Sequence, residues 1–329
     1  MPSAAKEMRL RRERRMKYTL GALLILTLVF ASLYQFAFIN PKFFDYAVSL
    51  RAPRLVAILT AGFAIAGASI VFQTIIRNTI VTPCLLGMNS LYVFVHTLVV
   101  FVFESGSILA VNPLISFTID LVVMGTVAWL VYNTVFARTG GNVLYILLIG
   151  TVLSTFFSSA QSSLTRIMDP NEYDALLNSL VANFSNVNGE VIVPSIMLLT
   201  VIAVWMRSEI AVLDILALGR ETAVNLGIEY NRVVRKLMLG VALYIAIATA
   251  LVGPLSFLGL ITANLSRQLF KTHRHSYLIA GSVLTGMLIL TAGQFIVEHI
   301  VLYSVPVSVF ITTGGGLYFL YLIVTANHR

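Results

Sequence analysis

The segment Leu216-Ala-Leu-Gly-Arg-Glu-Thr-Ala-Val-Asn-Leu-Gly227 interrupts a largely apolar chain. It is the centre of the longest charged stretch between two apolar runs, Arg207 to Arg235, and its polarity places it in water. If the segment is helical, Gly219, Ala223 and Gly227 are four residues apart and lie on one face. A face of small residues lets another protein's backbone approach closely. An ordinary connector between two membrane helices has the same composition, so the spacing alone leaves both interpretations open.

The chain on either side of this segment is apolar over most of its length. It has 329 residues, of which 58% are hydrophobic and 11% charged, unlike an ordinary soluble domain. A membrane-spanning helix needs roughly 20 apolar residues. Because lipid offers the backbone no hydrogen-bond partners, runs of this length must be helices. The candidate runs are residues 18–39, 54–76, 84–103, 113–136, 144–166, 191–207, 233–252, 256–270, 277–299 and 306–325.

These runs predict an all-α polytopic membrane protein with about ten transmembrane helices. A basic arm at residues 1–17 precedes a single transmembrane domain at 18–329, which is interrupted by the polar segment at 208–231. The arm is expected to meet anionic membrane lipid.

The charge distribution predicts the orientation of the chain. A formal net charge of +8 is compatible with a nucleic-acid partner. With both termini in the cytoplasm, however, all but four of the 22 Lys and Arg residues fall in cytoplasmic segments or helix ends, which is the positive-inside pattern. We therefore expect a multi-pass protein of the bacterial cytoplasmic membrane and no nucleic-acid partner. The exceptions are Lys42, Arg51, Arg54 and Arg166.

Two of these exceptions form the motif Leu50-Arg51-Ala-Pro-Arg54, directly before an apolar run. Outer arginines run against the positive-inside trend and need a reason. Anchoring to lipid phosphate is one explanation. Docking of a protein carboxylate is the other, because a guanidinium stays charged and binds a carboxylate through two parallel hydrogen bonds.

Several motifs resemble those of the binding-protein-dependent importer permeases that take up iron–siderophore complexes and vitamin B12, the FecCD type. The pattern L-G-x-x-x-A-x-x-L-G at Leu218–Gly227 resembles the coupling loop of that family. The stretch from Gly253 to Arg267 resembles the family's G-x-I-x-F-x-G-L-x-x-P-H-x-x-R. The Gln294 and Glu298 variant and the Gly314-Gly-Gly316 triplet most resemble permeases for ferric siderophores of the petrobactin and anguibactin branch.

The resemblance implies a vitamin B12 importer-type permease fold, partners and three sets of site residues. The partners are ABC ATPase subunits in the cytoplasm, an extracytoplasmic siderophore-binding protein and a second permease chain. The residues implied in ATPase coupling are Leu218, Gly219, Ala223, Leu226 and Gly227. Those implied in binding-protein docking are Arg51, Arg54 and Glu298. The re-entrant outer segment is marked by Gly253, Pro254, Phe257 and Gly259, since glycine and proline break a helix.

The sequence departs from the family pattern at three places. Thr79 follows Arg77-Asn78 where the family has proline, and Ala263-Asn264 stands in place of Pro-His. Glu298 occupies a position where the family usually has a third basic residue. In a homodimer this acid repels a carboxylate of the binding protein on both sides. That repulsion favours a heterodimer with a related chain that keeps the basic residue. Alternatively, Glu298 pairs with His299 or a nearby arginine and a homodimer works.

The sequence contains no recognisable catalytic, nucleotide-binding or metal-binding motif. There is no G-x-x-x-x-G-K-[ST] phosphate-binding loop and no Gly-Lys dipeptide, so the chain is not its own P-loop ATPase. No metal-ligand spacing or dinucleotide fingerprint occurs, and we expect no enzyme, catalytic residue, metal or cofactor. We predict the permease subunit of an ATP-driven ferric siderophore importer.

The alternatives are a permease of the same family for vitamin B12 or haem and an ion-coupled secondary transporter. The secondary transporter requires several charges within the membrane, of which Asp120 is the clearest. Asp120 either packs as a carboxyl bonded to a neighbouring helix or belongs to a polar pathway, and His96 is expected to be a satisfied core histidine.

Overall fold

The structure, a computed structural model, describes residues 2–138, 143–180, 182, 184, 187–302 and 305–326. Within these ranges the chain is helical almost throughout and contains no strand. The helices are α1 (Pro2–Phe36), α2 (Phe44–Ile76), α3 (Met88–Phe103), α4 (Ile108–Val111), α5 (Pro113–Arg138), α6 (Val143–Thr165), α7 (Pro170–Leu180), α8 (Ile192–Ala211), α9 (Leu213–Leu216), α10 (Arg220–Asn225), α11 (Tyr230–Val252), α12 (Leu258–Phe270), α13 (His275–His299) and α14 (Val307–Ala326). Short 3₁₀ helices precede α2 (η1, Pro41–Phe43), α3 (η2, Pro83–Leu86) and α8 (η4, Gly189–Val191).

The all-α membrane fold predicted from the apolar runs is confirmed. In the described part of the chain, six helical segments are long and apolar enough to cross a bilayer, and α3 and part of α14 are shorter apolar helices. The run at 256–270 corresponds to α12, which has 13 residues. At 1.5 Å per residue this helix is about 20 Å long, shorter than the roughly 30 Å core of a bilayer.

Helices α2 and α11 form the centre of the bundle. Helix α2 packs against α13, α11, α12 and α1. A Cβ atom at Gly62 would lie 2.9 Å from the backbone nitrogen of Met287, and one at Gly286 would lie 2.8 Å from the Cβ of Ala66. Gly62, Ala66 and Gly286 thus permit close packing of α2 on α13, because small residues let helix backbones approach. Gly67 makes only an ordinary van der Waals contact.

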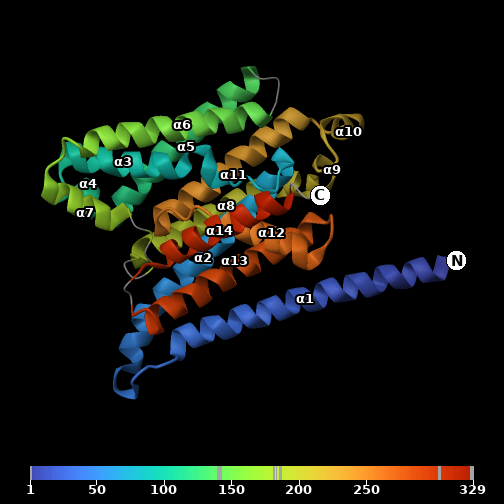
Figure 1. Cartoon of the computed structure of the whole chain (residues 1–329), viewed down its shortest axis with the longest axis horizontal. Coiled ribbons are helices and arrows are strands. Elements are labelled where there is room, and N and C mark those ends of the chain that lie inside the picture. The colour runs from blue at the N-terminus through green and yellow to red at the C-terminus, as the bar shows by residue number, and fades with distance from the viewer. Residues whose placement is uncertain are drawn as a thin grey trace.

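Helix α1 shows that the boundary at residue 17 is a change of charge and not of structure. The helix is continuous from Pro2 to Phe36, so the arm extends straight from the membrane-spanning part (Figure 1). Arg12 donates a hydrogen bond to the carbonyl of Lys271, and Glu13 lies 3.1 Å from the guanidinium of Arg274. The arm thus contacts the turn between α12 and α13.

Both ends of the chain lie toward the same end of the bundle. In Figure 1 the N-terminal end of α1, the C-terminal part of α14 and helices α9 and α10 are all on the right, whereas α4 and α7 are on the left. The polar segment thus shares a side with both termini, as the charge pattern predicted.

Candidate functional site

The polar segment at 208–231 does not form the single small-residue helix face that its spacing suggests. Helix α10 spans only Arg220–Asn225. Gly219 precedes it with φ of +110°, and Gly227 follows it with φ of +81°. These left-handed conformations favour glycine and interrupt the helix at both ends. The expectation that Gly219, Ala223 and Gly227 share one helical face is therefore wrong.

Among the exposed polar residues of this segment, large apolar side chains also face outward. Ala223 is fully buried in the main hydrophobic core, and Gly219 is buried too. In contrast, the side chains of Leu218 and Leu226 are 62% and 61% exposed, and Val224 is exposed between them. Ala223 and Gly219 therefore shape the segment from within, while the leucines face outward.

Two contacts join the segment to the rest of the bundle. A Cβ atom at Gly219 would lie 3.2 Å from Nη1 of Arg77, the left-handed residue that ends α2. Asp214 in α9 accepts a hydrogen bond from the backbone N–H of His275 at 2.8 Å. Neither contact is predictable from the sequence, because the partners are far apart along the chain.

At the opposite end of the bundle, Arg51 and Glu298 form an ion pair. Their Nη2 and Oε1 atoms are 2.8 Å apart, and the side chains are only 13% and 9% exposed. Arg51 also donates to the carbonyls of Tyr34 and Ala37 at the end of α1. Arg51 therefore joins α1, α2 and α13, and Glu298 pairs with a nearby arginine, the second alternative considered above.

Arg54 lies one helical turn further along α2 and is half-buried. In the described part of the chain it has no ion pair and no side-chain hydrogen bond. Of the two arginines in the motif, Arg54 is thus the one whose charge is not committed within the chain.

The chain between α11 and α12 is a non-helical segment inside the bundle. Helix α11 ends at Val252, and Gly253 has φ of +85°; a Cβ atom there would lie 2.8 Å from the Cα of Ala182. Phe257 packs against Gly315 of α14, where a Cβ atom would lie 2.2 Å from the Cβ of Phe257. Non-helical backbone at membrane depth is tolerated where protein covers it, and Gly253, Leu255 and Leu258 are buried.

Two departures from the family pattern meet in one contact. The amide of Asn264 donates to the carbonyl of Thr79 at 2.8 Å and to that of Leu260 at 3.0 Å. Gln73 donates to the same Thr79 carbonyl at 2.8 Å. Asn264 thus links α12 to the turn that follows α2.

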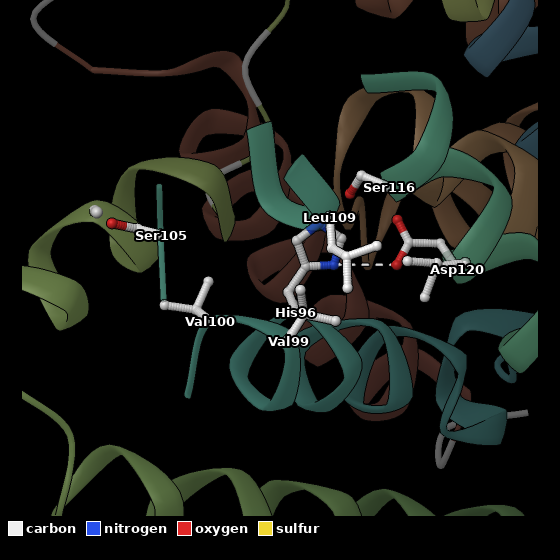
Figure 2. A pocket seen from close by; sticks show the side chains of 9 residues that line it. His96, Val99, Val100, Ser105, Leu109, Ser116 and Asp120 are labelled. Carbon is white, nitrogen blue, oxygen red and sulfur yellow. Dashed lines mark ion pairs between the residues drawn. The ribbon is translucent and has the colours of Figure 1, made fainter. Parts of the chain in front are cut away.

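Asp120 is paired with His96 inside the bundle. Nδ1 of His96 lies 3.1 Å from Oδ1 of Asp120, and the Asp120 side chain is almost fully buried. Figure 2 shows the imidazole from α3 facing the carboxylate from α5, with Ser116 one turn before Asp120. They line a cavity of about 180 Å³, together with residues of α4 and α7. The pair matches the interpretation of Asp120 as a carboxyl held by a neighbouring helix.

These features define a class of protein. A bundle of apolar helices, interrupted by a buried non-helical segment between α11 and α12 and carrying exposed leucines at one end, is a polytopic membrane protein. Within the described residues no three His, Cys, Asp or Glu side chains gather as a metal site.

The comparisons with known proteins identify the family. A model of the FecCD transport family matches residues 19–325, and the chain belongs to this family. It is 40% identical over 306 residues to the petrobactin import system permease protein YclO of Bacillus subtilis, covering 92% of this chain and 96% of that protein. It is 30% identical over 285 residues to the petrobactin import system permease protein FatC of Bacillus anthracis, covering 87% and 80% respectively.

A solved structure shares the fold. An inward-facing conformation of a putative metal-chelate type ABC transporter matches with a TM-score of 0.74 and 22% identity, covering 94% of this chain and 99% of the other.

Proposed function

We propose that this chain is the permease subunit of an ATP-binding cassette importer that moves a ferric siderophore across the cytoplasmic membrane into the cell. The observation that carries the proposal is the similarity, over 92% of the chain, to a petrobactin import permease. Uptake of a panel of labelled ferric siderophores by cells with and without this chain tests the substrate. The proposal requires that at least one ferric siderophore depends on the chain.

The energy for transport is proposed to come from separate ATPase subunits, because the sequence contains no P-loop. Leu218 and Leu226 are the proposed contact, since both side chains are exposed on a segment that projects at the end of the bundle where both termini lie (Figure 1). Burying such leucines in a partner's cleft stabilises the complex by about 1.5–3 kcal/mol each.

Changing both Leu218 and Leu226 to Glu is therefore expected to weaken ATPase binding by at least tenfold without affecting the fold. A pull-down of the ATPase by the permease measures this. Arg232→Gln is the matched control, because Arg232 is exposed beyond the segment and its surface ion pair with Glu229 contributes little. Undiminished binding by the double variant excludes this contact. Ala223→Leu is a poor probe because Ala223 is fully buried.

Docking of an extracytoplasmic binding protein is proposed to rely on Arg54. The partner's carboxylates need an uncommitted cation, and Arg51 is already bonded to Glu298 and to the end of α1. If the binding protein docks at the end of the bundle that carries Arg54, the opposite end faces the cytoplasm. We therefore propose that both termini lie in the cytoplasm, which the positive-inside pattern supports. We also propose that the basic side chains of the N-terminal arm lie near the anionic inner leaflet.

The working unit is proposed to contain two permease chains. The argument for a related second chain relied on an unpaired acid at Glu298, and the pair with Arg51 removes that argument. A second copy and a related chain are both compatible with a paired Glu298.

A further inference from the structure

His275 lies where three elements meet, and nothing in its sequence context marked it. It is the first residue of α13, directly after the turn that follows α12, and it is only 4% exposed. Its neighbour His273 in the same turn is exposed. A buried imidazole needs hydrogen-bond partners for both ring nitrogens.

The first partner is in the polar segment at 208–231, which is named the coupling segment from here on for its proposed role. Nδ1 of His275 lies 2.5 Å from Oδ1 of Asp214 in α9, and the same oxygen accepts the backbone N–H of His275 at 2.8 Å. A carboxylate at a helix N-terminus also interacts favourably with the helix dipole, here that of α13. Asp214 therefore binds the side chain and the backbone at the start of α13 at once.

The second partner is at the end of α2. Nε2 of His275 lies 2.9 Å from the hydroxyl oxygen of Thr74. Three residues further on, Arg77 ends α2, and its guanidinium lies against Gly219 just before α10. The end of α2 therefore reaches the coupling segment twice, through His275 to Asp214 and through Arg77 to Gly219.

The two helices that His275 joins are themselves closely packed. Gly62 of α2 and Gly286 of α13 bring the backbones together, and the hydroxyl of Ser282 donates to the carbonyl of Ala66. We expect helices packed this closely to move together, since a tight interface does not deform continuously.

We infer that His275 is a positioning residue that fixes the coupling segment to the joined ends of α2 and α13. A displacement of the segment by the ATPase is then transmitted to these two helices. The inference rests on the proposed coupling function and adds the route by which the movement enters the bundle.

The first test is the amount of ferric siderophore transported per ATP hydrolysed by the assembled complex. His275→Ala and Asp214→Ala each remove charge-assisted or buried hydrogen bonds, and each is expected to lower this ratio by about tenfold. His275→Asn keeps a donor near the position of Nδ1 but cannot reach Thr74, so it should restore part of the ratio. His273→Ala, in the same turn, should leave the ratio unchanged.

The link between Thr74 and His275 has its own test. Thr74→Val removes the hydroxyl from the other side, so Thr74→Val and His275→Asn should be non-additive when combined. Additive losses would show that the two residues act separately and would contradict the inference.

Hydrogen–deuterium exchange on the permease alone separates this inference from the coupling proposal. His275→Ala is expected to raise exchange in residues 213–226 by at least tenfold, and His273→Ala is not. Unchanged exchange and an unchanged transport ratio in His275→Ala overturn the inference. Raised exchange in His275→Ala, with normal ATPase binding by the Leu218 and Leu226 variant, instead contradicts only the proposed ATPase contact.

Discussion

At the scale of single residues, the two arginines of the outer motif have different roles. Arg51 and Glu298 are both largely buried, and removing one partner leaves the other charge uncompensated. Arg54 follows Arg51 after only Ala52 and Pro53. Nothing in the described chain neutralises its charge. The sequence motif presents the two arginines as equivalent, and the fold makes them different.

We predict that Arg51→Ala destabilises the permease by about 3 kcal/mol, because it strands the buried Glu298 carboxylate. Arg54→Ala should change stability by less than about 0.5 kcal/mol. Thermal unfolding in detergent measures both. A second variant, Arg51→Met with Glu298→Met, should recover much of the loss since no charge is left unpaired. Equal stability of the two single variants would show that the ion pair contributes nothing.

The affinity for the binding protein should be affected more by changes at Arg54 than by changes at Arg51, the reverse of the effect on stability. Arg54→Glu replaces attraction with repulsion and should weaken docking, and the defect should shrink at high salt because the contact is partly screened. Arg51→Lys, which keeps the buried charge, should dock almost normally. A binding assay with the cognate binding protein checks this, and normal affinity of Arg54→Glu would favour lipid anchoring instead.

At the scale of elements, the sequence predicted the apolar helices well and the coupling segment less well. Long apolar runs have few alternatives in a bilayer, so the helix positions follow from length and hydropathy. The small residues of the segment are spaced as in a helix, but Gly219 and Gly227 occupy left-handed positions that end one. Residue spacing does not distinguish a glycine on a helix face from a glycine at a helix terminus.

The contacts that orient the elements were beyond the reach of the sequence. His96 with Asp120, Asn264 with Thr79 and His275 with Asp214 each join residues that lie far apart along the chain. A single sequence shows that such groups are polar, but not which of them meet. The stripe of Gly62 and Ala66 was predictable because close helix packing needs small residues whatever the partner.

Close packing of α2 on α13 should make Gly62 sensitive to a single methyl group. Gly62→Ala places a Cβ atom 2.9 Å from the Met287 backbone and should destabilise the fold by about 1–3 kcal/mol. Gly67→Ala is the matched control on the same helix, where a Cβ atom meets only Val283 at 3.5 Å. Unfolding midpoints in detergent compare the two variants. Similar midpoints for the two variants would mean that the contact between α2 and α13 accommodates an extra methyl group at Gly62.

At the scale of the whole molecule, the proposed pairing of two permease chains is open to a direct test. Two differently tagged copies of this chain, expressed with the ATPase, should co-purify if a second copy completes the transporter. Because Glu298 is paired with Arg51, a second copy presents no unpaired acid to the binding protein at that position, and we expect two copies to suffice. Association only with a related permease chain would show that the second chain is different.

We propose above that this chain moves a ferric siderophore at the expense of ATP hydrolysed by another subunit. The most direct measurement is uptake of labelled ferric siderophore into vesicles that contain the permease assembly, its ATPase and its binding protein. We predict uptake that requires ATP, stops when the ATPase is inactivated by mutation and persists when ionophores collapse the ion gradients. Uptake that continues with the inactive ATPase and stops with the ionophores would contradict the account and identify an ion-coupled transporter.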